Sequence, residues 1–225
     1  MNSMPHPVIL VEGLDGVGKS TLVNTIATKL HASIIASPPK IPDPLNQHRD
    51  LRTRMDQRKT SVRREFYRSG NFHASLLIEE ARKHGPVVLD RYWPSTASFA
   101  VLDDYQPQWE PLGVWPRGLV EPDIIILLTV NEDNRLKRMT KRGLISTEEE
   151  ARLEKRSQIR AEVIEALRCF EPIEIDTSHL NTDEVFSEVI FWLKQAGILS
   201  SIGSNQSDIT AHKDSSANAF EEKGV

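Results

Sequence analysis

The residues best suited to chemistry lie in a glycine-rich segment near the start of the chain. Residues 13–20 read G-L-D-G-V-G-K-S, which fits the pattern G-x-x-x-x-G-K-S. An apolar run at 7–11 reads as a buried strand, and the apolar spacing of 21–30 predicts a helix. A glycine-rich loop between a strand and a helix aims backbone N–H groups and a helix N-terminus at phosphate oxygens. This context predicts a binding site for a nucleoside triphosphate.

The side chains of this loop have expected roles toward ATP. Lys19 would reach the β- and γ-phosphates, and Ser20 would ligate the Mg²⁺ that accompanies the nucleotide. The predicted ATP-binding residues are Gly13, Leu14, Asp15, Gly16, Val17, Gly18, Lys19, Ser20 and Thr21. The histidines are scattered and the chain has one cysteine, Cys169, so the sequence indicates no metal other than Mg²⁺ bound with ATP.

Length, charge and composition exclude several classes of protein. At 225 residues and 39% hydrophobic, the chain can bury one core, and a net charge of −4 disfavours binding to a nucleic acid polymer. No apolar run approaches the roughly 18 residues needed to span a bilayer, so we expect no membrane association. A single cysteine excludes an intrachain disulfide and fits a reducing compartment. We expect a cytoplasmic protein, or a mitochondrial one if a presequence was trimmed.

Alternating patterns predict the elements that must position the loop. Short apolar runs predict strands at 7–11, 33–36, 87–90, 123–130 and 173–176. Helical patterns fall at 21–30, 45–58, 62–83 and 95–102, after Asn131, at 146–170 and after Asn181. Strands separated by helices predict an α/β fold with a parallel sheet between two helical layers, the three-layer architecture of P-loop NTPases. We expect an N-terminal arm at 1–6, one folded domain at 7–199 and a disordered tail at 200–225.

The glycine-rich loop alone does not determine which group accepts the phosphoryl group: water, a sugar hydroxyl or a phosphate. The chain lacks the N-K-x-D segment of a GTPase, and 37–40 offer no carboxylate base of the kind that a nucleoside kinase needs for a hydroxyl acceptor. A monophosphate acceptor needs cations instead. Basic residues cluster at 49–68 and 135–142, where they are either phosphate ligands or solvated helix faces.

The glycine-rich loop and several other short segments of the chain resemble the thymidylate kinase family of nucleoside monophosphate kinases. Within that family, they are most similar to the mitochondrial UMP-CMP kinase 2 type. The matching segments are 12–20, 37–39, 63–64, 66–67, 70–72, 90–97, 115–116, 122–123, 138 and 142–143. The resemblance implies that Asp15 positions the acceptor nucleotide and that Arg91 binds its phosphate. It also implies an aromatic residue near the acceptor sugar at Phe99, although a helix core position explains Phe99 equally well.

The resemblance implies a short lid at about 137–147. Gly16 stands where another branch of the family carries a catalytic arginine in the loop, so we expect the lid to supply that cation through Arg142 or Arg138. The predicted catalytic residues are Lys19, Asp15, Arg91, Arg142 and Arg138.

Two departures from the family pattern affect the acceptor site. The family's Phe-Pro-x-Arg segment is replaced by Ser37-Pro38-Pro39-Lys40, and Arg64 is the candidate substitute for its arginine. Phe72 replaces an arginine that hydrogen-bonds thymine in the family, which would leave recognition to stacking and shape. The predicted acceptor-binding residues are Ser37, Pro38, Arg64, Tyr67, Asn71, Phe72, Asp90, Arg91, Ser95 and Phe99.

The leading hypothesis is therefore an ATP-dependent kinase of pyrimidine nucleoside monophosphates: dUMP, dCMP, UMP and CMP. A thymidylate kinase acting on dTMP is the nearest alternative. A catalytically weak ATP-binding protein is a third, and the presence of Lys19, Ser20, Asp15 and Arg91 argues against it. The family resemblance also implies a possible homodimer.

Overall fold

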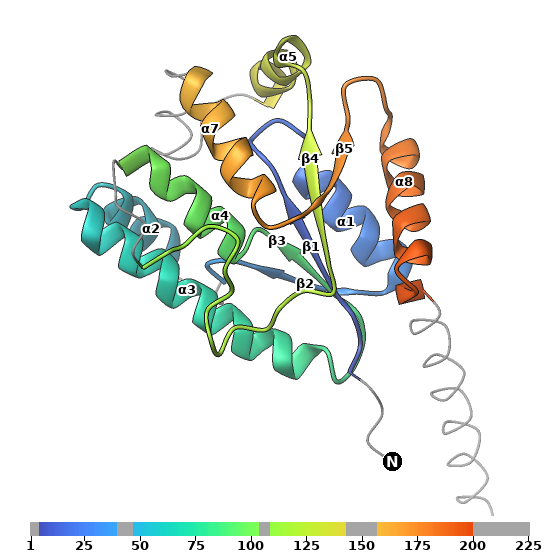
Figure 1. The fold of residues 1–225 in the computed structure, drawn as a ribbon, viewed down its shortest axis with the longest axis horizontal. Coiled ribbons are helices and arrows are strands. Elements are labelled where there is room, and N and C mark those ends of the chain that lie inside the picture. The colour runs from blue at the N-terminus through green and yellow to red at the C-terminus, as the bar shows by residue number, and fades with distance from the viewer. Residues whose placement is uncertain (1–4, 40–46, 104–108, 143–156, 200–225) are drawn as a thin grey trace, which may run out of the picture.

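The computed structural model describes residues 5–39, 47–103, 109–142 and 157–199. Within these ranges, a five-stranded sheet lies between two layers of helices (Figure 1). The strands are β1 (Val8–Glu12), β2 (Ser33–Ala36), β3 (Val87–Asp90), β4 (Ile124–Thr129) and β5 (Ile173–Asp176). The helices are α1 (Lys19–Leu30), α2 (Gln47–Asp56), α3 (Thr60–Ala81), α4 (Trp93–Ser98), the 3₁₀ turn η1 (Phe99–Asp103), α5 (Glu132–Arg142), α7 (Ser157–Arg168) and α8 (Thr182–Gln195).

The sheet is parallel throughout, in the order β2-β3-β1-β4-β5. Each of the first four strands is followed by a helical crossover to the next strand, as parallel pairing requires. The five predicted strands and the α/β fold class are confirmed. Because β1 is central, the glycine-rich loop that follows it emerges in the middle of the carboxyl edge of the sheet. This is the edge at which open α/β sheets bind ligands.

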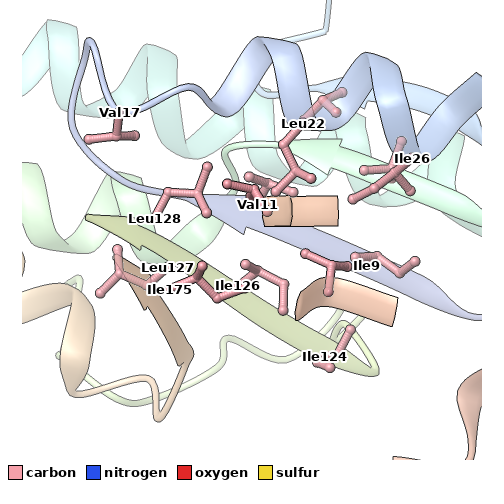
Figure 2. Close-up of a cluster of buried hydrophobic side chains, with 14 of the residues drawn as sticks. Ile9, Val11, Val17, Leu22, Ile26, Ile124, Ile126, Leu127, Leu128 and Ile175 are labelled. Atoms are coloured by element: carbon pink, nitrogen blue, oxygen red, sulfur yellow. The ribbon is translucent and has the colours of Figure 1, made fainter. Parts of the chain in front are cut away.

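Both faces of β1 are buried, which explains why its sequence is continuously apolar. Ile9 and Val11 belong to a cluster that also holds Leu22 and Ile26 of α1, and Figure 2 shows these helix residues lying over the strands. Val8 and Leu10 point to the other face of β1, and they pack in a second cluster with residues of α3 and α4. Thus α1 and α8 cover one face, and α3 and α4 cover the other (Figure 1).

Helix ends follow their sequence signals closely. Asn181 caps α8 by accepting hydrogen bonds from the backbone N–H groups of Asp183 and Glu184, and the Glu184 side chain completes a capping box. The Asn131 side chain accepts from Asn134 N at 2.9 Å at the start of α5. Both predicted caps are confirmed.

The boundaries of three predicted segments differ or cannot be followed. The helix expected at 95–102 begins two residues earlier, because Pro94 is compatible with a first helical turn, and gives way to the 3₁₀ turn at Phe99. The helix expected at 146–170 is described only as α7, from Ser157. The tail at 200–225, arm residues 1–4 and lid residues 143–147 lie outside the described residues.

Candidate active site

Gly13 begins the glycine-rich loop directly after β1. Its φ angle is +138°, and a Cβ atom there would lie 2.5 Å from the carbonyl oxygen of Leu128 in β4. Because a side chain cannot be accommodated so close to the neighbouring strand, this position requires glycine. The loop therefore leaves the sheet tightly against β4, and α1 follows it at Lys19.

The side chain of Lys19 folds back over the loop. Its Nζ donates to the Leu14 carbonyl oxygen at 2.8 Å and lies 3.5 Å from Oδ1 of Asp15. Burial lowers the pKa of Lys19 to about 8, and the Arg91 guanidinium acts in the same direction. Because α1 has no acidic residue in its first turn, the positive end of the helix adds to the attraction that this ammonium exerts on a phosphate.

Arg91 connects the turn after β3 to the same loop. Its backbone is left-handed, with φ at +65°, and its Nη2 donates to Oδ1 of Asp15 at 2.9 Å. Burial alone would lower the pKa of Arg91, but the carboxylates of Asp15, Glu12 and Asp90 raise it overall. The guanidinium carbon lies 5.1 Å from the ring centroid of Phe99, within the range of a cation–π contact. Arg91 is thus a permanently charged donor held beside the loop.

Glu12 is a buried carboxylate to which the sequence analysis gave no role. Its Oε1 accepts from the backbone N–H groups of Tyr92 at 3.0 Å and Ser95 at 3.2 Å, and its Oε2 accepts from Ser95 Oγ at 2.5 Å. Burial raises the pKa of Glu12, although these hydrogen bonds and Arg91 oppose the rise. The last residue of β1 therefore fixes the segment that carries Arg91. Its place at the carboxyl end of a strand was the available signal.

Asn71 of α3 connects its own helix to α4 and to the segment after β2. Its Nδ2 donates to Thr96 Oγ1 at 2.7 Å and to the Tyr67 carbonyl oxygen at 2.9 Å, and its Oδ1 accepts from Ser37 Oγ at 2.9 Å. A Cβ at Gly70 would lie 2.7 Å from the Cβ of Pro38, so α3 packs tightly on the segment after β2. Asn71 is fully buried and positions its neighbours.

These elements enclose a cavity of about 950 Å³ along the carboxyl edge of the sheet. Sixteen predicted site residues line it: Asp15, Gly16, Val17, Gly18, Lys19, Ser20, Thr21, Ser37, Pro38, Arg64, Tyr67, Asp90, Arg91, Ser95, Phe99 and Arg138. Gly13, Leu14, Asn71 and Phe72 are not part of this lining. Residues that line the cavity without having been predicted include Arg52, Thr96, Thr177 and Asn181.

Arg138 is fixed against the loop rather than extended over the cavity. It donates to the Val17 carbonyl oxygen at 3.1 Å, to Thr177 Oγ1 at 2.9 Å and to the Thr177 carbonyl oxygen at 2.8 Å. It therefore ties α5, the loop and the end of β5 together. Arg142 is the last residue of α5, and its side chain lies outside the described part of the chain.

The geometry of a glycine-rich loop, a buried lysine and an arginine joined to the loop by a carboxylate agrees with the comparison with known families. The family model described as thymidylate kinase matches residues 11–189. The chain belongs to the thymidylate kinase family. The resemblance inferred from the sequence is thereby confirmed.

Relatives in this family differ in their named substrates. The human protein named UMP-CMP kinase 2, mitochondrial, is 38% identical over 163 residues, which are 69% of this chain and 35% of that protein. A probable thymidylate kinase of Methanocaldococcus jannaschii is 26% identical over 188 residues, 83% of this chain and 95% of its own length. The chain thus spans about a third of the human relative and nearly all of the archaeal one.

Solved structures of two nucleotide and nucleoside kinases share the fold of this chain. Thymidylate kinase from Candida albicans superposes with a TM-score of 0.66 at 19% identity, covering 86% of this chain and 93% of that one. Deoxyadenosine kinase from M. mycoides gives a TM-score of 0.56 at 21% identity, covering 84% and 99%. The three-layer P-loop NTPase fold is therefore shown.

Arg64 was expected to replace the arginine of the family's Phe-Pro-x-Arg segment. Its Nε lies 3.3 Å from each carboxylate oxygen of Glu110, and its Nη2 donates to the Thr96 carbonyl oxygen. Both side chains of the Arg64–Glu110 pair are almost fully buried, and Arg68 donates to the same carboxylate at 3.1 Å. Although Arg64 lines the cavity, its Nε and Nη2 are engaged with protein groups.

Phe72, expected to face the acceptor base, is not brought to the cavity. Its side chain is 45% exposed on α3. Tyr67, which precedes it by about one and a half helical turns, does line the cavity. Of the two aromatic residues of α3 predicted to bind the acceptor, only Tyr67 lines the cavity.

The described residues contain neither a metal-binding cluster of side chains nor a membrane-spanning helix. No group of three or more His, Cys, Asp or Glu side chains in them is arranged to hold a metal ion. No helix among them is long and apolar enough to cross a membrane.

Proposed function

We propose that this chain is an ATP-dependent kinase of pyrimidine nucleoside monophosphates, with dUMP, dCMP, UMP and CMP as acceptors. The observation that carries the proposal is the connection from Lys19 through Asp15 to Arg91 inside one cavity. It holds a cation for the donor triphosphate next to a cation for a second phosphate. Two phosphates that repel one another need such cations to approach in line.

The two ends of the cavity suit two nucleotides. The loop, Arg138 and the segment from Thr177 to Thr182 surround the donor end. Ser37, Tyr67 and Phe99 line the other end, on the far side of Arg91. Pockets for small ligands span roughly 300–1,000 Å³, so a volume of about 950 Å³ is large for a single ligand and fits a site for both substrates.

The proposed transfer uses the protein mainly for positioning and charge. Lys19 would bind the β- and γ-phosphates, and Arg91 would bind the acceptor phosphate and neutralise charge on the transferred group. The acceptor oxygen is already anionic and needs no general base, which agrees with the absence of a carboxylate from residues 37–39. Asp15 would keep Lys19 and Arg91 at a fixed separation.

Mg²⁺ fits the oxygen atoms present at the donor end. Ser20 and Asp90 both line the cavity, and hydroxyl and carboxylate oxygens are ligands that Mg²⁺ prefers. Bound with ATP, the ion would offset the negative charge of the phosphates. We propose that Ser20 holds Mg²⁺ together with the nucleotide, with Asp90 as a second candidate ligand.

The choice of pyrimidine acceptors rests on the absence of an arginine at Phe72 and on the human UMP-CMP kinase 2 as a relative. An aromatic surface at Tyr67 would support stacking with any pyrimidine. A dTMP kinase is the second candidate, because thymidylate kinases are prominent among the relatives.

A coupled ADP-release assay with ATP, Mg²⁺ and dTMP, dUMP, dCMP, UMP, CMP or AMP tests the proposal. We expect kcat/KM to be highest for dUMP, dCMP, UMP or CMP and low for dTMP, and we expect Lys19→Ala to reduce turnover to background. Lys83→Ala, which changes an exposed lysine just after the C-terminal end of α3, serves as the matched control. Preference for dTMP would establish the thymidylate kinase alternative, and ATP binding without transfer to any acceptor would establish the weak ATP-binding protein.

We also propose a homodimer, as the family resemblance implies. Phe72, Leu76 and Leu77 form an exposed apolar face on α3, and a second copy would cover it. Sedimentation equilibrium of the chain and of Leu76→Glu tests this, since only the former should dimerise.

For the compartment we propose the cytoplasm, with the mitochondrion as the alternative that the name of the human relative suggests. Cell fractionation separates the two.

A further inference from the structure

Arg52 of α2 is a cavity residue outside the family segments found in the sequence. Its guanidinium carbon lies 6.0 Å from the ring centroid of Tyr67, and both side chains line the cavity. The Tyr67 ring is fixed from the same helix, because its Oη donates to Asp56 Oδ1 at 2.7 Å in a buried contact. α2 thus supplies one residue that orients the aromatic ring and another that lies next to it.

The topology places α2, which carries Arg52, after the edge strand and not after the central strand that leads into the glycine-rich loop. The loop follows the central strand β1, whereas α2 follows β2, the edge strand. α2 packs against α3, on the face of the sheet opposite α1 (Figure 1). An acceptor whose phosphate meets Arg91 at the centre would extend its sugar and base toward this edge. Tyr67 and Arg52 would therefore meet the base.

Arg91 and Arg64 also line this part of the cavity, where each contacts groups other than Tyr67. Arg91 is joined to the loop through Asp15, and Arg64 donates to Glu110 and to Thr96. A guanidinium beside an aromatic ring can donate to a base that packs on that ring. Uracil, cytosine and thymine all carry a carbonyl oxygen at C2, whereas adenine carries none.

We propose that Arg52 recognises the pyrimidine base of the acceptor by donating a hydrogen bond to its C2 carbonyl oxygen while the base packs against Tyr67. The proposal rests on the proposed function for the identity of the ligand. A single donor of this kind would suit several pyrimidines. It also assigns base recognition to α2, because Phe72 on α3 lies outside the cavity lining.

Equilibrium binding to Arg52→Met tests the proposal without relying on turnover. Dissociation constants for UMP and for ribose 5-phosphate, which keeps the sugar and phosphate but has no base, are measured by isothermal titration calorimetry. We expect the Kd of UMP to rise roughly 10- to 100-fold and that of ribose 5-phosphate to stay within about twofold, because one charge-assisted hydrogen bond to the base is lost. Arg54→Met, an exposed arginine of the same helix, should bind both as the unmodified chain does.

Two other binding results would overturn the proposal. Equal weakening of UMP and ribose 5-phosphate would show that Arg52 binds the phosphate, and unchanged UMP binding would show no contact; either overturns the proposal. Arg52→Lys keeps a charge and a donor, so it should lie between Arg52→Met and the unmodified chain, and it replaces Arg52→Met if that variant does not fold. An unmodified chain that binds UMP without phosphorylating it would reject the proposed function alone, whereas failure to bind any pyrimidine monophosphate would reject both.

Discussion

Nη2 of Arg91 lies 2.9 Å from Oδ1 of Asp15, and this contact joins the turn after β3 to the glycine-rich loop after β1. The same carboxylate oxygen lies 3.5 Å from Nζ of Lys19. Asp15 therefore separates two cations that would otherwise repel one another, and it does so where two phosphates would meet. A short residue inside the loop sets the spacing on which the proposed transfer depends.

Asp15→Asn is expected to lower kcat/KM for the acceptor about 100-fold, because the amide does not hold Arg91 by charge. Arg91→Lys should have a similar effect. If the two act as a unit, the double variant will be less impaired than the sum of the single changes predicts, with a coupling energy of about 1–3 kcal/mol. A double-mutant cycle of kcat/KM measures this. Strict additivity would show that the ion pair plays no part in turnover.

The pH dependence of ATP use should report the ionisation of Lys19. Its pKa is lowered to about 8, so raising the pH through this value removes the charge that attracts the triphosphate. We expect kcat/KM for ATP to be level below about pH 7 and to fall about tenfold per pH unit well above pH 8. Bound phosphates favour the ammonium form, so the fall in kcat at saturating ATP should move to higher pH. A kcat/KM profile that stays level to pH 10 would contradict this assignment.

Arg142→Ala is expected to impair the transfer step, whereas Arg138→Ala is expected to impair ATP binding and stability. Arg142 is the lid candidate for charge stabilisation in the transition state, so its loss should lower kcat about 100-fold with little change in the Kd of ATP. Arg138 fixes the loop through Val17 and Thr177, so its loss should weaken ATP binding and lower the Tm. Steady-state kinetics, ATP titration and thermal melts of both variants separate these roles. Equal loss of kcat and ATP affinity in Arg142→Ala would remove the lid assignment.

Glu110→Gln should destabilise the fold by about 3–5 kcal/mol, because it leaves the buried Arg64 guanidinium without a carboxylate. Arg68, which shares that carboxylate, would lose a partner as well. Urea denaturation measures the free energy of unfolding. Glu165→Gln, in an exposed pair with Arg168, is the control and should be nearly neutral. A small effect at Glu110 would show that water or another side chain compensates for the lost charge.

Local sequence signals predicted most of the fold. The strands, the caps at Asn131 and Asn181, and the loop with Lys19 were all identified because their signals are local: apolar periodicity, capping side chains and glycine spacing. Membership of the thymidylate kinase family also followed from short segments. These features depend on residues within one turn or one strand of each other, so a single sequence contains them.

Tertiary structure decided which charged side chains reach the cavity. Along the chain, Arg52 and Arg64 look alike, as two arginines on predicted helices. Their difference comes from residues far away, because Glu110 engages Arg64 from 46 positions further along while Arg52 lies beside Tyr67. Phe72 and Tyr67 differ for a similar reason, since the packing of α3 sets which aromatic ring faces inward. A sequence determines which side chains can carry charge or stack, but only the packing of distant elements determines what each one contacts.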